Sequence, residues 1–125
     1  MTITLHLFPG NWVGIKHSVG VEESLFENVE DTSKLCGLPV TEDRLKRLLG
    51  FMPYSATSGT EKLSGLIKQV TIDENAFFTI KAFSESNGWR ITIEDSNFSN
   101  ILSASAKHIH QIQNLFIAIT GNELV

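Results

Sequence analysis

Two histidines near the C-terminus, His108 and His110, are the residues whose type most readily binds a metal ion. Their spacing argues against such a site. On a helix, side chains two residues apart point in nearly opposite directions, so this pair cannot hold one ion as an i, i+4 pair can. We therefore expect two solvent-facing histidines on either side of a buried Ile109, with no bound metal and no cofactor.

Nucleophilic and phosphate-binding chemistry has equally little support. The single cysteine, Cys36, lies in line with Leu25 and Val29 on an apolar helical pattern, and buried cysteines of this kind are usually inert. The stretch 57–62 is rich in Ser, Thr and Gly, but Glu61 would repel a phosphate there. The glycine signatures of serine hydrolases and dinucleotide-binding folds are also missing from the sequence. We predict no catalytic residue and a protein that is not an enzyme.

One feature that stands out is a concentration of acid. Residues 22–43 hold seven of the 14 acidic side chains and a single basic one, Lys34. The segment 21–36 has helical spacing, and four of its acids fall at i, i+4, i+7 and i+8 on one predicted face: Glu23, Glu27, Glu30 and Asp31. This acidic stripe is either a solvated helix face or a surface that steers a basic partner.

A β-hairpin is the most strongly patterned element. The strands 77–83 and 89–94 flank Asn87-Gly88, the dipeptide that best accepts a type I′ turn. A two-residue turn there puts Ile91 and Ile93 on the buried face, and a slip of one residue would turn both outward. The register also predicts four cross-strand pairs, which are Ser84–Ile91, Ala82–Ile93, Glu85–Arg90 and Lys81–Glu94.

Hydrophobic period divides the rest of the chain. Alternation predicts a half-buried strand over 2–8 and a strand over 66–72 that joins the hairpin through an odd-length loop at 73–75. The mixed signals over 11–20 predict an extended connection with room for a second short strand. Helical spacing predicts helices over 21–36, from Thr41 to Gly50, and from Ser99 or Ser103 to Gly121. The segments 51–60 and 95–100 are predicted as loops.

These elements predict an α+β fold in a single domain over residues 1–125. The antiparallel sheet consists of the N-terminal strand plus a three-stranded meander. Two helices of the N-terminal half and a C-terminal helix pack against it.

Composition limits the classes of function. An apolar fraction of 42% and a charged fraction of 19% are ordinary for a soluble globular protein. A net charge of −4 argues against nucleic-acid binding, which needs a basic surface. The first residues lack the pattern of a signal peptide, and no apolar run approaches the ~20 residues of a membrane span. We expect a cytoplasmic protein with neither a nucleic acid nor a membrane as partner.

A small, acidic α+β domain without catalytic motifs, carrying the stripe of Glu23, Glu27, Glu30 and Asp31, resembles the bacterial immunity proteins that neutralise nuclease toxins, as in contact-dependent growth inhibition. The resemblance implies a cytoplasmic inhibitor that binds a basic toxin tightly and plugs or overlaps its active site. These proteins share no motif, so no site residue is carried over from them. The contact residues predicted from this chain are the acidic stripe and Tyr54.

Two other classes of function remain open. A small enzyme or ligand-binding domain would use His6, His17 or Tyr54 in a cleft between sheet and helices. A structural subunit would pair a sheet edge with a partner or with a second copy as a homodimer. A deep pocket containing two histidines would favour the enzyme, and a convex acidic face would favour the inhibitor.

Overall fold

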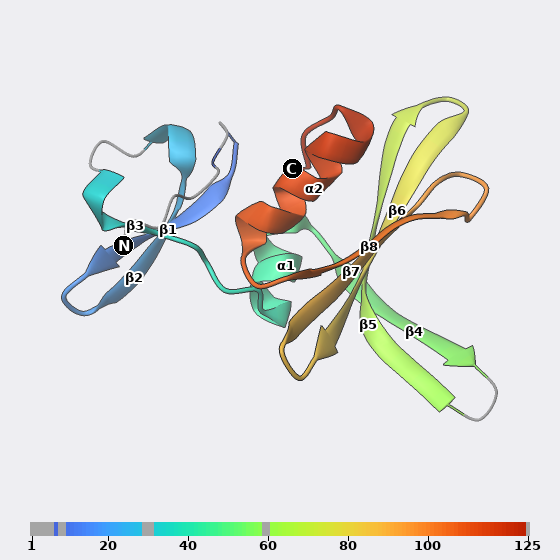
Figure 1. Cartoon of the computed structure of the whole chain (residues 1–125), viewed down its shortest axis with the longest axis horizontal. Coiled ribbons are helices and arrows are strands. Elements are labelled where there is room, and N and C mark those ends of the chain that lie inside the picture. The colour runs from blue at the N-terminus through green and yellow to red at the C-terminus, as the bar shows by residue number, and fades with distance from the viewer. Residues whose placement is uncertain (1–6, 8–9, 29–31, 59–60, 125) are drawn as a thin grey trace. The chain divides into compact units, whose positions relative to one another are not determined.

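The computed structural model describes residues 7, 10–28, 32–58 and 61–124. Within them it contains antiparallel sheets of three and five strands and two α-helices, so the α+β class is confirmed (Figure 1). The chain separates into two compact units. We call Met1–Pro39 together with His108–Val125 the terminal unit, and Val40–Lys107 the central unit. The single domain predicted over residues 1–125 stays a prediction.

The terminal unit contains a small sheet and a helix. The sheet has the order β2-β1-β3, from β1 (Trp12–His17), β2 (Gly20–Leu25) and β3 (Leu35–Cys36). Two single turns of 3₁₀-helix, η1 (Phe26–Asn28) and η2 (Thr32–Lys34), lie between β2 and β3. The helix α2 (Ile109–Thr120) follows the central unit in the chain.

The helix predicted over 21–36 is wrong. On a helix, Val21 and Cys36 would be about 22 Å apart along the axis. They meet instead over Gly14 of β1, where an added Cβ would lie 2.7 Å from both Cys36 Sγ and Val21 Cγ1. The missing side chain of Gly14 therefore lets the neighbouring strands close on β1. Of the strand predicted over 2–8, only Leu7 lies within the described residues, and it is in neither a helix nor a strand.

A buried glutamine ties α2 to β1. Gln113 is 2% exposed, and its amide donates hydrogen bonds to the carbonyls of Gly10 at 2.9 Å and Leu124 at 3.2 Å. Its Oε1 accepts the backbone N–H of Trp12 at 2.8 Å. A buried amide is stable only when its donors and acceptor are paired, so this side chain fixes both ends of the chain around the helix.

The central unit contains a five-stranded sheet with the order β4-β5-β6-β7-β8, in place of the predicted N-terminal strand plus meander. Its strands are β4 (Met52–Ser58), β5 (Glu61–Asp73), β6 (Ala76–Glu85), β7 (Gly88–Glu94) and β8 (Asn100–Ala106). The loop predicted over 51–60 and the early start of the C-terminal helix are therefore wrong. The small Ser, Thr and Ala residues of β4 and β8 leave no clear alternation of apolar and polar side chains in the sequence. The two strands pair with β5 and β7 respectively.

The β6–β7 hairpin is confirmed, but its register is displaced by two residues. The turn is Ser86-Asn87, and Gly88, with φ +141°, opens β7. Ile91 therefore faces Ala82 and not Ser84. A shift of two keeps every side chain on its face, so Ile91 and Ile93 are buried as predicted. Both charge pairs also form, as diagonal neighbours that long side chains can reach.

The predicted common face of the β5 and β6 side chains is also confirmed. Leu66 and Val70 pair with Ala82 and Phe78, and a bulge between Thr71 and Asp73 supplies the extra residue. Asn75 does not take the left-handed conformation that we predicted. Lys68 lies on this face, where its ammonium donates a hydrogen bond to the Leu49 carbonyl at the end of α1.

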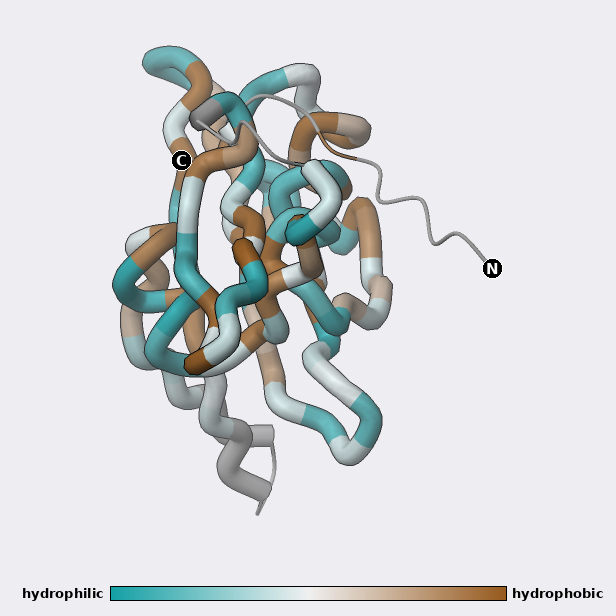
Figure 2. Tube along the Cα trace, turned by 90° about the vertical axis from the view of Figure 1, so that its left-hand side faces the viewer, coloured by the Kyte–Doolittle hydropathy of each residue, from teal (hydrophilic) through white to brown (hydrophobic). Residues whose placement is uncertain are grey.

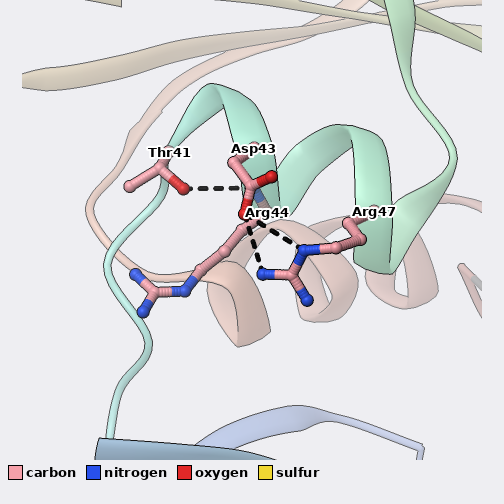
Figure 3. Close-up of polar contacts among 4 residues, drawn as sticks. All are labelled: Thr41, Asp43, Arg44 and Arg47. Carbon is pink, nitrogen blue, oxygen red and sulfur yellow. Dashed lines mark hydrogen bonds and ion pairs between the residues drawn. The ribbon is translucent and has the colours of Figure 1, made fainter. Parts of the chain in front are cut away.

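The helix α1 (Glu42–Leu49) begins and ends where the sequence predicts. Figure 3 shows the polar contacts of Thr41, Asp43, Arg44 and Arg47. The Thr41 hydroxyl accepts the Arg44 N–H at 3.1 Å, and Gly50 closes the helix with φ +73°. Asp43 accepts two hydrogen bonds from Arg47 one turn later, at 2.8 and 3.1 Å. Leu45 and Leu49 are buried on the opposite side.

Apolar and polar segments interleave along the chain trace (Figure 2). In the central unit the buried apolar residues of the sheet share one face: Leu66, Ile80, Ala82, Ile91, Ile93 and Ala106. In the terminal unit the largest buried side chains are Leu38, Ile109, Ile112, Phe116 and Leu124. Among the described residues, neither helix is both long and apolar enough to cross a membrane.

Candidate binding groove

The face of the central sheet that turns away from its buried residues carries a groove of about 310 Å³. Its lining comes from four successive strands and from the loop after β7, because every second residue of a strand points to the same face. The lining residues are Tyr54, Ile67, Gln69, Phe77, Thr79, Lys81, Glu94 and Phe98.

A glycine allows the aromatic pair at the β4 end of the groove. Tyr54 of β4 pairs with Gly65 of β5, and a Cβ on Gly65 would lie 2.7 Å from the ring of Phe83. Without that atom, the rings of Tyr54 and Phe83 meet edge to face, with centroids 6.2 Å apart. Such pairs contribute roughly 0.5–1.5 kcal/mol beyond the area that they bury.

A second aromatic pair closes the other end. Phe98 lies 6.3 Å from Phe77, also edge to face, and is 72% exposed. Among the described residues it is the one non-glycine with a positive φ, at +61°. Asp95 holds this turn, because its Oδ1 accepts the backbone N–H groups of Asn97 at 2.9 Å and Ser99 at 3.0 Å.

An ion pair lies in the groove between the two aromatic ends. Lys81 Nζ is 3.1 Å from Glu94 Oε1, and both side chains are largely buried, at 21% and 17% exposed. The ammonium also lies 5.2 Å from the centre of the Tyr54 ring. Burial alone would lower the pKa of Lys81, but the hydrogen bond and charge of Glu94, helped by Tyr54, outweigh it and raise that pKa. The lysine therefore stays a cation, and the pair has no net charge.

The acidic stripe does not exist as a helix face. Glu23 is a half-buried residue of β2, Glu27 is exposed in η1, and Glu30 and Asp31 lie outside the described residues. These two described acids belong to the terminal unit, whereas Tyr54 belongs to the central unit and lines the groove. The set of contact residues predicted from the sequence is therefore divided between the two units.

Of the histidines named for an enzyme, His17 does not line the groove that contains Tyr54. His17 stands at the end of β1, where its Nε2 lies 3.3 Å from Glu22 in an exposed pair. His6 lies outside the described residues. None of the described residues that line the groove is a histidine.

The prediction of two solvent-facing histidines is wrong. His108 precedes α2 in an extended conformation, so the opposed directions of a helix do not apply. The rings of His108 and His110 stack, with centroids 5.7 Å apart and planes within 12°. His110 is 4% exposed and its Nδ1 has no hydrogen-bond partner among the described residues. Within the same residues, no group of three or more His, Cys, Asp or Glu side chains could hold a metal ion.

Tyr54 is the one described lining residue of the groove that the sequence predicts as a contact residue. Phe98 stands in a segment correctly predicted as a polar turn, and a large aromatic residue among Asp, Ser and Asn was the available signal. The ion pair of Lys81 and Glu94 was predicted as a sheet contact and not as part of a site. Compared with known proteins, the sequence matches no protein-family model and no curated protein, and the structure matches no solved structure.

Proposed function

We propose that this chain is a non-enzymatic binding protein and that the groove of the central sheet is the surface with which it holds a partner protein. The observation that carries the proposal is the conformation of Phe98. A left-handed backbone costs a non-glycine residue about 1–2 kcal/mol, and this residue also exposes 72% of its surface. Glycine would take this conformation without strain, so a phenylalanine kept there points to a role outside the turn, and strain of this kind gathers at functional sites.

The partner that we propose is a basic protein, such as the nuclease toxin that the resemblance implies. Charge supports this choice. The net charge of −4 resides in the terminal unit, whose sequence has six acidic and two basic residues, whereas the central unit has eight of each. A field of this sign raises the association rate of a basic partner.

The titratable groups among the described residues of the groove also favour binding over chemistry. Lys81 is held as a cation by Glu94, and a protonated amine is not a nucleophile. The remaining polar groups are the amide of Gln69 and the hydroxyls of Tyr54 and Thr79. These groups orient a ligand through hydrogen bonds.

Affinity capture with matched baits tests the proposal. Wild type, Phe98→Ala and Val19→Ala serve as baits, since Val19 is an exposed apolar residue of the terminal unit, at 96%, that does not line the groove. Each captured protein is then purified and titrated against all three.

We expect a basic protein that binds wild type and Val19→Ala with equal affinity and binds Phe98→Ala at least ten-fold more weakly. A partner that binds Phe98→Ala as tightly as wild type would remove the groove from the contact surface. An acidic partner would contradict the proposed class.

A further inference from the structure

The shape of the groove selects among the ways in which a protein can hold a peptide. Addition of a strand requires a free sheet edge, but the groove lies on a face, and its inner strands β5 and β6 are paired on both sides. The groove also runs between aromatic side chains at its two ends, Tyr54 at one and Phe98 at the other. We therefore consider an extended segment that lies along the groove.

The walls of the groove fit proline rings. Tyr54 stands at one end, and Phe77 with the exposed Phe98 stands at the other. Aromatic-lined grooves are the surfaces that hold polyproline II helices, whose rings stack on aromatic faces and whose conformation is already ordered before binding.

The floor fits the backbone of such a helix. Proline has no N–H, so a proline-rich segment presents carbonyl oxygens alone and needs donors. The groove offers donors from Tyr54, Gln69, Thr79 and Lys81. The neutral pair of Lys81 and Glu94 also favours an uncharged ligand over an arginine or an acidic side chain.

We propose that the groove takes a proline-rich segment of the partner in the polyproline II conformation; this inference rests on the proposed binding function. The length follows from the sheet. On β6, Phe77 and Lys81 are four residues apart, a span of about 14 Å. Lys81 lies beside Tyr54, so this span joins the two aromatic ends of the groove. At 3.1 Å per residue, four to five residues of polyproline II cover it.

To test this inference, the full chain is titrated with proline oligomers of three, five and eight residues and with a Gly-Ser octamer. Binding is measured from the NMR shifts of the backbone amides. We expect saturable binding that strengthens at least five-fold from three to five prolines and changes less than two-fold from five to eight. Phe98→Ala should weaken octaproline binding at least five-fold. Ile101→Ala, an exposed apolar residue of β8 that does not line the groove, should change it less than two-fold.

Three results would overturn the inference. They are no saturable shift with octaproline, equal binding of the Gly-Ser octamer, and octaproline binding that does not depend on Phe98. A failure here is distinct from a failure of the proposed function, since a basic protein captured through Phe98 could contain no proline-rich segment. A Gly-Arg octamer that binds through Phe98 in place of octaproline would also overturn it.

Discussion

At the scale of the residue, Phe98 separates stability from function. Glycine accepts a positive φ without strain, so Phe98→Gly should relieve about 1–2 kcal/mol. It also gives up the contact with Phe77 and adds unfolded-state freedom worth roughly 0.5–1 kcal/mol. Because the lost aromatic contact is itself worth roughly 0.5–1.5 kcal/mol, the free energy of unfolding should stay within ~1 kcal/mol of wild type, measured by urea denaturation. Ile101→Gly, at an exposed position with an ordinary φ, should destabilise. A loss above ~1 kcal/mol in Phe98→Gly would show that this phenylalanine serves the fold.

The buried His110 should make stability depend on pH. Burial, and then the charge of His108, lower the pKa of His110 below its ordinary value of 6.5. Below pH 6.5 the unfolded chain therefore binds a proton that the folded chain refuses, and stability falls as the pH decreases toward the lowered pKa. Urea midpoints between pH 7.5 and pH 5 measure this slope. His110→Phe should flatten it, whereas His17→Gln, at an exposed site, should leave it in place. An unchanged slope in His110→Phe would assign the effect to another group.

At the scale of the element, the two ion pairs of the β6–β7 hairpin offer an internal comparison. The side chains of Lys81 and Glu94 are 21% and 17% exposed, whereas those of Arg90 and Glu85 are 40% and 44% exposed. Solvent screening should therefore leave the outer pair with a coupling energy of about 0.2–0.5 kcal/mol and the groove pair with ~1 kcal/mol or more. Double-mutant cycles to alanine measure both at low and high salt. Equal coupling energies would contradict the difference in burial.

The core face of the central sheet should be sensitive to truncation. Ile91 is fully buried opposite Ala82, so Ile91→Ala should lower the free energy of unfolding by ~2–5 kcal/mol. Thr92→Ala, one residue later on the other face, provides the control and should cost far less. A loss under 1 kcal/mol at Ile91 would mean that this face is not a packed core.

The period of the apolar residues predicts an element correctly where one of its faces is buried. It fails where the same spacing fits two kinds of structure. The isoleucines of β7 determine which face is buried, but this pattern does not distinguish a turn at Ser86-Asn87 from one at Asn87-Gly88, since both keep that parity. The preference of Asn-Gly for a type I′ turn favoured the second, and the structure has the first. The spacing of Leu25 and Val29 with Cys36 imitates a helix. Only the closeness of Val21 and Cys36 over Gly14, a contact distant in sequence, decides for strands.

The groove was harder to predict than the fold. Its residues come from β4 to β7 and the loop that follows, so no short stretch of sequence contains its pattern. Tyr54 was found as an apolar residue in a supposed loop. Lys81 and Glu94 were predicted as an ion pair of the hairpin. Their burial depends on the aromatic side chains that line the groove with them.

The sheet-edge homodimer stays a prediction, and the edges carry features that oppose it. Pro53 lies in β4, and the β7–β8 register shifts by one residue near Ile101. Glu22 and Glu23 lie in β2, the outer strand of the terminal sheet. Proline, bulges and charge are the common ways in which proteins discourage edge pairing.

At the scale of the whole molecule, acid in the terminal unit should act on association rates. Glu22 and Glu27 are both exposed, so exchanging both for lysine should slow the binding of a basic partner by ten-fold or more at low salt. High salt should shrink the difference, whereas dissociation should change little. Stopped-flow mixing measures both rates. The same exchange at Glu74, an exposed acid of the electrically neutral central unit, provides the matched control. If the variant and the wild type associate equally fast at every salt concentration, Glu22 and Glu27 belong to a solvated surface that does not steer a partner.

The hydrogen bond from the Val40 N–H to the Lys107 carbonyl, 3.0 Å long, joins the two ends of the central unit. On the other side of the same boundary, Pro39 and His108 form a β-bridge within the terminal unit. The central unit is thus a cassette inserted at one point of another fold, with its entry and exit side by side. Neighbouring ends are what domain insertion and circular permutation require. A lineage could therefore gain, lose or exchange this groove-bearing cassette in a single genetic event while the terminal unit kept its chain path.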